Sequence, residues 1–413
     1  MTAPLTTADG LPLKRALQRA QRSARWRAFG LVAPLLLFVV VTFLVPIGQM
    51  LHRSIHNPAF ADNMPALSDW FRSTPAGTAP DEAAYAALAA DLKQAAAART
   101  VAIVGTRINY DLPGTRSLFT ATGRKAASLS PPYQPALLAA DPKWGDPALW
   151  ATMRAASPAY TPGFYLSALD LTRATDGSIA AVPPERRVYV PLFLRTFALS
   201  AAITGLCLLL AFPIAHMLAT LPLRWSNLLM ILVLLPFWTS LLVRTTAWIV
   251  LLQQQGVINS ALVALGIIGD SGRLPMIYNQ TGTMVAMTHV LLPFMVLPLY
   301  SVMRTINPAY VRAARSLGAT SWTAFRRIYL PQTLPGIGAG ALLVFILAVG
   351  YYITPALVGG ASGQLISNLI AFHMQDSLNW SLAAALSALL LGSVVILYWL
   401  YDRLIGIDNM KLG

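Results

Sequence analysis

The stretch that decides the fold is Asn307 to Pro335, NPAYVRAARSLGATSWTAFRRIYLPQTLP, which lies between two very apolar runs. Asn307 is a good helix cap, and Pro308 suits a first helical position because its missing N–H would have no partner there. Gly318 favours a left-handed turn at the end of this helix. We therefore predict a short helix over 308–317.

The predicted helix is amphipathic and basic. Its apolar and small residues share one face, because they fall at i, i+3, i+4 and i+7; they are Tyr310, Ala313, Ala314 and Leu317. Arg312 and Arg315 lie three residues apart on another face. The pattern predicts a surface helix that lies against another body.

A second short helix is expected after this turn. Thr320 or Ser321 can cap it, it runs through Ile328, and Pro331 stops it. Two other interpretations of so basic a loop stay open. It can be a cytoplasmic loop that only obeys membrane topology, or a DNA-binding helix-turn-helix, although tethering between two membrane spans disfavours the latter.

The composition indicates an integral membrane protein. The chain has 413 residues, of which 56% are hydrophobic and only 11% charged, whereas soluble domains carry about 25% charged residues. The net charge of +14 is explained by Lys and Arg on cytoplasmic loops that face anionic lipid. The single cysteine, Cys207, lies in an apolar run and cannot form an intramolecular disulfide.

The amino-terminal part predicts a tail, a span and an inserted domain. Residues 1–27 form a basic polar tail that we expect in the cytoplasm. Residues 28–51 are uncharged and long enough to span the membrane. Residues 52–190 are rich in Pro, Ala, Asp and Arg, so we expect a periplasmic insertion domain. Within it, Asp81 to Arg99 predicts an Ala-rich helix and Val101 to Gly105 a strand.

Residues 191–405 predict a core of five further spans, with a cytoplasmic loop at 307–335 and a cytoplasmic tail at 406–413. The uncharged run Thr245 to Gly269 decides the topology. If it crossed the membrane, the short loop with the densest positive charge would lie outside, against the positive-inside rule. We therefore expect this run to be re-entrant or interfacial, with Trp225 to Val243 as a span. Gly359 to Gln364 is a second candidate re-entrant piece.

Two sets of residues combine a helix-breaking proline with aromatic or hydroxyl side chains at membrane depth. They are Phe237, Trp238, Thr239 and Ser240 after Pro236, and Tyr351 and Tyr352 before Pro355. Broken helices are tolerated in membranes where they line a cavity, so these residues are candidates for a translocation pathway. The alternative for each is ordinary helix packing with interfacial aromatics.

Other site chemistry is missing from the sequence. It has neither a Gly-rich phosphate loop nor paired carboxylates inside a span, so a partner must supply energy or transport is passive. His52 and His56 have a metal-binding spacing but straddle a span end without nearby carboxylates, so no metal site is expected. The absence of clustered catalytic side chains also argues against a membrane enzyme.

The pattern Ala313-Ala314-x3-Gly318-x9-Ile328-x-Leu330-Pro331 resembles the EAA loop of ABC importer permeases. In that family the first helix of this loop is the coupling helix, which sits in a groove of a cytoplasmic ATPase. The resemblance carries the coupling role to Tyr310, Arg312, Ala313, Ala314, Arg315, Leu317 and Gly318. Arg312 departs from the family, which carries Glu there, so the charge at the expected contact is reversed.

A narrower resemblance appears in three further segments, Pro236 to Leu252, His289 to Arg304 and Tyr351 to Gly360. With the loop, they look like permeases of the spermidine/putrescine importer group, over about residues 190 to 405. That group also includes permeases for opines, aminoalkylphosphonates and ferric iron. A polyamine is therefore the leading substrate, with those solutes as alternatives, and a passive channel or a membrane sensor is the alternative of a different class.

The resemblance implies an all-α, six-span type I ABC importer permease in a bacterial inner membrane, with both termini cytoplasmic. It implies a cytoplasmic ATPase dimer, a second permease that forms a heterodimer with this chain, and a periplasmic solute-binding protein. Lipid surrounds the spans, and no nucleic acid is expected. ATP and Mg²⁺ would be bound by the ATPase, and no cofactor by this chain.

Overall fold

The computed structural model describes residues 13–174 and 177–405. The predicted tail 406–413 and the first twelve residues of the predicted amino-terminal tail lie outside the described residues. The chain forms two compact units, Met1–Arg53 and Ser54–Gly413, and each is described by itself.

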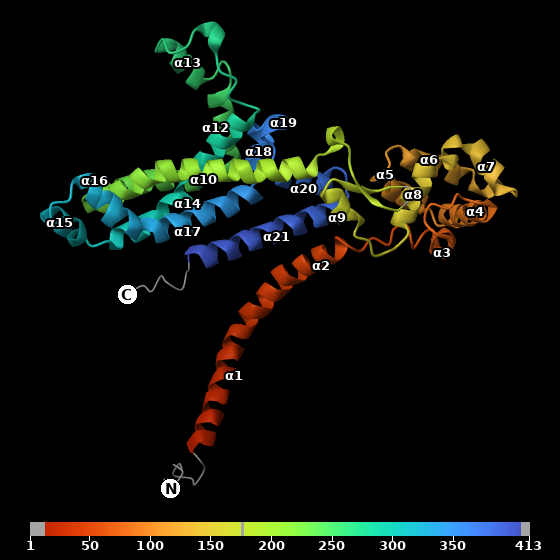
Figure 1. Cartoon of the computed structure of the whole chain (residues 1–413), viewed down its shortest axis with the longest axis horizontal. Coiled ribbons are helices and arrows are strands. Elements are labelled where there is room, and N and C mark those ends of the chain that lie inside the picture. The colour runs from red at the N-terminus through yellow and green to blue at the C-terminus, as the bar shows by residue number, and fades with distance from the viewer. Residues whose placement is uncertain (1–12, 175–176, 406–413) are drawn as a thin grey trace. The chain divides into compact units, whose positions relative to one another are not determined.

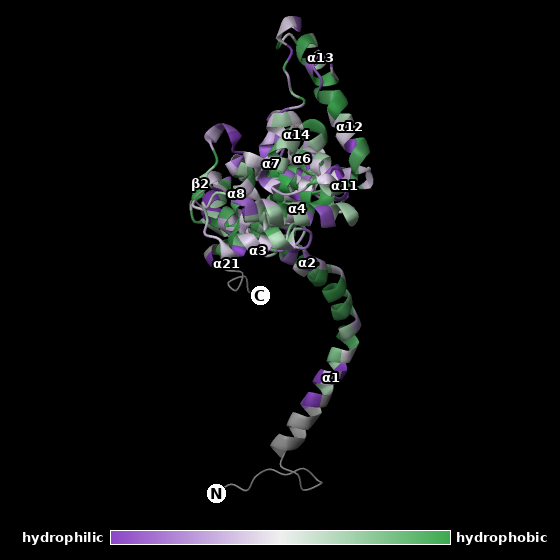
Figure 2. Cartoon of the chain, turned by 90° about the vertical axis from the view of Figure 1, so that its right-hand side faces the viewer, coloured by the Kyte–Doolittle hydropathy of each residue, from purple (hydrophilic) through white to green (hydrophobic). Residues whose placement is uncertain are grey.

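The first unit is one long helix with a π-helical turn. α1 (Leu13–Val39) passes through the π turn Val40–Leu44 into α2 (Val45–Arg53). The turn accommodates Pro46, which has no N–H to donate to the preceding turn. Figure 2 shows hydrophilic residues along α1 near its label and mainly hydrophobic residues from there into α2. The predicted span 28–51 lies wholly inside this helix.

The first part of the second unit, residues 54–188, is a small helical body that we call the insertion domain. Its elements are α3 (Pro65–Ser73), α4 (Glu82–Ala97), α5 (Val101–Asn109), α6 (Thr115–Arg124), α7 (Tyr133–Ala140), α8 (Pro147–Ala156), α9 (Gly163–Ala168), β1 (Leu171–Arg173) and β2 (Ile179–Ala181). The two strands form an antiparallel hairpin in which Leu171 pairs with Ala181. The predicted Ala-rich helix is confirmed as α4, capped by Asp81, whose carboxylate accepts from the Ala84 N–H at 2.9 Å.

The insertion domain has its own aromatic core. The Trp144 indole N–H donates to Thr122 Oγ1 at 3.0 Å, and the Tyr85 hydroxyl donates to the Trp144 carbonyl at 3.2 Å. Buried Asp91 accepts from the backbone N–H of Leu67 at 2.8 Å and so caps α3. Burial raises the pKa of Asp91, and this backbone N–H lowers it by less. The insertion therefore buries enough side chains to form a body of its own.

The predicted strand at Val101 to Gly105 is wrong, because this segment begins α5. Val101, Val104 and Ile108 share one helix face and are buried in the domain core. α6 packs so closely against this helix that a Cβ on Gly105 would lie 3.0 Å from Phe119 Cβ. A short apolar run fits a strand or a buried helix equally well, and tertiary packing decided between them.

The rest of the second unit is a helical bundle built around α10 (Tyr189–Thr220), α14 (Gln280–Thr305) and α17 (Leu330–Gly350), which pack against one another pairwise. Their buried side chains form one apolar core. The other bundle helices are α11 (Leu223–Trp238), α12 (Leu241–Leu252), α13 (Val257–Ala264), α18 (Ile353–Val358), α19 (Gly360–Gly363), α20 (Ile366–Gln375) and α21 (Trp380–Ile405). α20 packs against both α10 and α21, and α21 also packs against α17, beside which it lies in Figure 1.

Within the described residues, six helices are long and apolar enough to cross a membrane. They are Ala24–Arg53, Tyr189–Thr220, Leu241–Ala264, Gln280–Thr305, Ser321–Gly350 and Trp380–Arg403. The predicted number of six spans is confirmed, but one member of the set differs. The expected span at 225–243 forms only the shorter helix α11, whereas Leu241–Ala264 qualifies by length and composition although Gln253 to Gly256 separate α12 from α13.

The insertion domain and the loop 307–335 lie at opposite ends of α10, the bundle's longest helix (Figure 1). At its first turn, Asp170 of the insertion domain accepts from the Val190 N–H at 2.7 Å. At its last turn, the Ala219 carbonyl accepts from Arg304 Nη1 at 3.0 Å, at the end of α14. A helix of 32 residues is about 48 Å long, more than the thickness of a bilayer core.

The Gly-rich segment after α18 folds into a tight backbone contact with the start of α14. Gly360 has φ +52°, and a Cβ there would lie 2.3 Å from the Tyr278 carbonyl oxygen. The Thr283 hydroxyl donates to the Gly363 carbonyl at 3.0 Å, and the Tyr278 N–H donates to the Val358 carbonyl at 2.8 Å. The predicted re-entrant piece 359–364 is thus a short helical turn, α19, packed against protein.

Candidate functional site

The loop 307–335 begins as the sequence predicts. α15 spans Pro308–Ser316, and the Asn307 side chain caps it by accepting from the Ala309 N–H at 2.9 Å. Gly318 has φ +90°, the left-handed conformation that glycine adopts most easily. Thr320 then caps the next helical segment by accepting from the Thr323 N–H at 3.2 Å.

The predicted single face of α15 divides into two sides. Val311 packs against the bundle core and Ala314 is half-buried, so this side faces the protein. Tyr310 and Leu317 are 57% and 89% exposed, and Ala313 is exposed with them. Ala314 therefore lies on the bundle side rather than on the exposed apolar side, because α15 uses that side to pack on the end of the bundle.

The exposed part of the loop is uniformly basic. Its exposed cations are Arg312, Arg315, Arg326 and Arg327. None of these arginines has an acidic partner in the described part of the chain. The stretch Asn307 to Pro335 contains no Asp or Glu of its own. An apolar strip beside unpaired guanidinium groups is suited to a partner groove that is apolar at its base and acidic at its rim.

The expected stop at Pro331 is wrong, because the helix that starts at Ser321 continues to Gly350. A π turn over Phe325–Tyr329 lies directly before Pro331 in this continuous helix, and its shifted hydrogen-bond pattern accommodates the proline, which has no N–H to donate. The Gln332 amide donates to the Ile328 carbonyl at 2.7 Å. The loop is therefore joined to the bundle by continuous helix.

Both predicted helix breaks exist. α11 ends at Trp238 and α12 begins at Leu241, so Thr239 and Ser240 form the first break. Arg244 binds this break, because its Nη2 donates to the Thr239 carbonyl at 2.9 Å. A guanidinium at a helix carboxyl end also offsets the negative end of the helix dipole.

The second break is at Tyr351 and Tyr352, between α17 and α18. Ser367 Oγ donates to the Tyr351 carbonyl, and Asn368 Nδ2 donates to the Tyr352 carbonyl at 2.7 Å. Side chains thus replace the helical partners that the break removes, as a non-helical backbone at membrane depth requires. Tyr351 is half-buried and Tyr352 is 41% exposed.

The structure brings the two breaks to neighbouring helices, because α12 packs against α18 and α14. The Trp248 indole N–H donates to His289 Nδ1 at 3.1 Å and so ties α12 to α14. Trp238, by contrast, is 87% exposed and points away from the core. The sequence missed Arg244, Ser367 and Asn368 as supports of the breaks. A polar residue a few positions after a proline-linked break was the available signal for Arg244.

The comparisons with known proteins agree with this arrangement. Residues 186–405 match the family described as "Binding-protein-dependent transport system inner membrane component". The chain is 34% identical over 225 residues to the spermidine/putrescine transport system permease protein PotB of Haemophilus influenzae, covering 54% of this chain and 78% of that one. It is 35% identical over 222 residues to PotB of Escherichia coli, covering 53% and 80%.

A solved structure, a bacterial ABC transporter involved in the import of the acidic polysaccharide alginate, is similar with a TM-score of 0.42 and 20% identity, covering 54% of this chain and 86% of that one. The family match covers more than half of the chain and contains the loop 307–335 and both helix breaks. The insertion domain lies almost wholly outside it. The chain belongs to the binding-protein-dependent transport system inner membrane components, the permeases of ABC importers.

Proposed function

We propose that this chain is a permease subunit of an ATP-driven importer, and that its substrate is a polyamine delivered by a periplasmic solute-binding protein. The observation that carries the proposal is α15, which leaves Tyr310 and Leu317 exposed at the end of the bundle opposite the insertion domain. These two exposed apolar side chains, beside arginines that have no acidic partner among the described residues, suit a partner surface that is apolar with an acidic rim. A cytoplasmic ATPase dimer, which would bind the ATP and Mg²⁺, is the partner that fits the family.

Coupling follows from helix continuity. The helix that begins at Ser321 next to α15 runs unbroken to Gly350, directly before the break at Tyr351. When the ATPases close and carry α15 with them, this helix would transmit the movement to the break as a rigid rod. The bundle would then change from inward-open to outward-open, in the manner of a rigid-body rearrangement.

The polyamine assignment is supported by the printed functions of the two relatives and by the chemistry at the breaks. Cations bind to aromatic faces and to carbonyl oxygens. Trp238, Tyr351 and Tyr352 provide aromatic faces, whereas the carbonyls at the breaks already accept hydrogen bonds from Arg244, Ser367 and Asn368. Acidic groups are missing there, which favours a weak pathway in which the binding protein sets specificity. A second, non-identical permease would complete this pathway.

The substrate is tested by competition in cells that take up labelled spermidine through this system. We expect unlabelled spermidine and putrescine to compete, because both present ammonium groups at polyamine spacing. An opine, an aminoalkylphosphonate and ferric iron serve as the other competitors. Strong inhibition by one of these, with none by the polyamines, would replace the polyamine assignment and leave the permease assignment in place.

Arg312→Glu is expected to weaken assembly with the ATPase, because it puts a carboxylate where the partner faces an exposed guanidinium. The effect should be about tenfold in affinity at low ionic strength and smaller at high salt, where exposed charges are screened. Co-purification across a salt series measures it. Arg72→Glu, on an exposed arginine of the insertion domain, makes the same charge change away from the loop and should leave assembly unchanged.

The proposed topology places the insertion domain outside the cell and both chain ends inside. With Cys207 replaced by Ala, a cysteine at exposed Arg124 of α6 should be labelled in intact cells by an impermeant maleimide. A cysteine at exposed Ser316 should be labelled only after the cells are opened. Labelling of Ser316→Cys in intact cells, with protection of Arg124→Cys, would reverse the orientation.

A further inference from the structure

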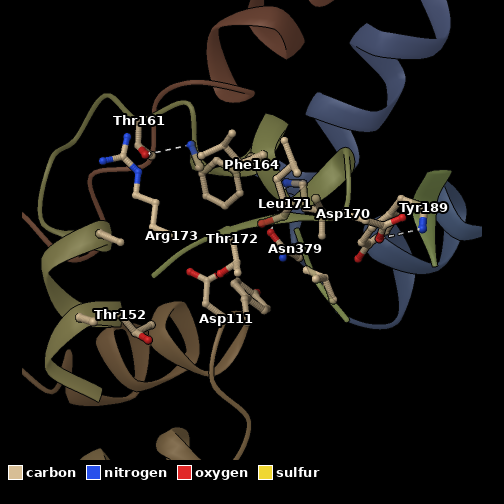
Figure 3. Close-up of a pocket in the computed structure, with 18 of the residues that line it drawn as sticks. Asp111, Thr152, Thr161, Phe164, Asp170, Leu171, Thr172, Arg173, Tyr189 and Asn379 are labelled. Carbon is tan, nitrogen blue, oxygen red and sulfur yellow. Dashed lines mark hydrogen bonds between the residues drawn. The ribbon is translucent and has the colours of Figure 1, made fainter. Parts of the chain in front are cut away.

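A cavity of about 360 Å³ lies where the insertion domain meets the bundle. Its lining comes from α5, α8, α9, the β1–β2 hairpin, the start of α10 and the segment before α21. Figure 3 shows Asp111, Arg173 and Thr161 on one side of the hollow and Asp170 and Tyr189 on the other, with Asn379 between them. We propose that this cavity binds a small anion that carries a carboxylate or a phosphate group.

The acidic groups of the cavity are already bound. Asp170 accepts from the backbone N–H groups of Val188 at 3.0 Å, Tyr189 at 3.2 Å and Val190 at 2.7 Å, and so caps α10. Asp111 pairs with Arg107 Nη1 at 2.6 Å. These carboxylates therefore serve the fold and leave little negative charge to attract a cation.

The basic groups are in excess. Arg107, Arg173 and Arg186 line the cavity with Asp111 and Asp170, which leaves a net charge of one positive unit. In the described residues neither Arg173 nor Arg186 has an acidic partner. Arg107 is buried and its Nε has no hydrogen-bond partner in the structure. Guanidinium groups bind carboxylate and phosphate oxygens in pairs of parallel hydrogen bonds.

A buried amide provides a further donor. Asn379 is only 4% exposed and lines the cavity. Its Oδ1 accepts from the Leu382 N–H at 3.2 Å, while its Nδ2 has no partner among the described residues. The Thr161 oxygen accepts from the Gly163 N–H at 3.0 Å, so its own proton is free to donate. Both groups can therefore donate a hydrogen bond to an oxygen atom of a bound ligand.

The cavity also has an aromatic wall. The Arg107 guanidinium lies over the Phe164 ring, and its Cζ is 4.9 Å from the centre of that ring. The Tyr110 hydroxyl donates to the Leu378 carbonyl at 3.1 Å, which joins α5 to the loop before α21. Burial raises the pKa of Tyr110, so it remains a neutral donor at physiological pH. An anion in the cavity would therefore contact both the insertion domain and the bundle.

This site is independent of the transported solute. A polyamine carries only positive charge, and the surplus guanidinium charge of the cavity repels it. Failure of the polyamine assignment would leave the anion site untouched, and loss of the anion site would leave the polyamine assignment untouched. The two proposals are separated by using different probes on the same assembled transporter.

The test is isothermal titration of the assembled transporter in lipid nanodiscs with succinate, with inorganic phosphate and with putrescine. We expect one of the two anions to bind saturably, which also tells carboxylate from phosphate chemistry, and putrescine not to compete with it. Absence of saturable binding by both anions at millimolar concentration would overturn the proposal, as would displacement of the bound anion by putrescine.

Two variants locate the site. Arg173→Ala with Arg186→Ala removes the two cations that have no acidic partner among the described residues. Asn379→Asp places a negative charge in the cavity while keeping the Oδ1 acceptor for Leu382. Each should weaken anion binding by about tenfold or more, since charge-assisted hydrogen bonds are the strong ones. The matched control, Arg116→Ala with Arg124→Ala, removes two exposed arginines of α6 and should change nothing. Equal binding in all three would contradict the site.

Discussion

Replacing Leu317 with aspartate should abolish ATP-dependent uptake while the permease still inserts and folds. Leu317 is 89% exposed in this chain, so the change removes no internal contact. Burying a leucine against a partner contributes about 2 kcal/mol, and leaving a carboxylate in that contact costs more. The affinity of the permease for the ATPase should therefore fall by a factor of about 30 or more. It is measured as binding-protein-stimulated ATP hydrolysis by the reconstituted complex.

The control for this change is Leu317→Met, which keeps an apolar side chain of similar volume and should keep most of the stimulation. Ala314→Trp makes a different test, because Ala314 lies on the bundle side of α15. That variant should tilt α15 on the bundle rather than block the partner contact directly. Normal stimulation with Leu317→Asp in a correctly assembled complex would remove α15 as the coupling element.

Gly360→Val should prevent the bundle from packing. The new Cβ would lie 2.3 Å from the Tyr278 carbonyl oxygen, and the backbone has φ +52°. Backbone atoms cannot move aside as a flexible side chain can, so the start of α14 must separate from α19. Overpacking combined with a strained left-handed residue should cost about 3 kcal/mol or more.

The measurement is the thermal unfolding temperature of the purified permease complex. Gly205→Val, in the middle of α10, is the matched control because nothing lies within 4 Å of its added Cβ. We expect Gly360→Val to lower the unfolding temperature strongly or to abolish assembly, and Gly205→Val to leave it nearly unchanged. Equal behaviour of the two variants would mean that the contact between Gly360 and Tyr278 does not hold the bundle together.

The parts of the fold that depend on local rules could be predicted from the sequence. Asn307 caps α15, Gly318 turns left-handed, and both helix breaks occur at the predicted residues, each within three or four residues of a proline. The number of spans followed from hydrophobic length. In each case the information lies within one continuous stretch of the chain.

The parts of the fold that depend on tertiary packing could not be predicted from the sequence. Val101 to Gly105 form a helix because this segment packs closely against α6. Pro331 failed to end its helix because a π turn upstream shifted the hydrogen-bond register. The residues that line the cavity could not be predicted. Asp111, Arg173 and Asn379 come from three distant segments, and no sequence spacing indicates that they lie close together in the fold.

The most direct test of the central claim is uptake of labelled spermidine into proteoliposomes that contain the assembled transporter. ATP is enclosed inside and the loaded binding protein is added outside. We predict accumulation against the gradient when both are present, and none when ATP is replaced by a non-hydrolysable analogue or the binding protein is omitted. Equilibration of spermidine without ATP and without the binding protein would contradict the account and show a passive channel.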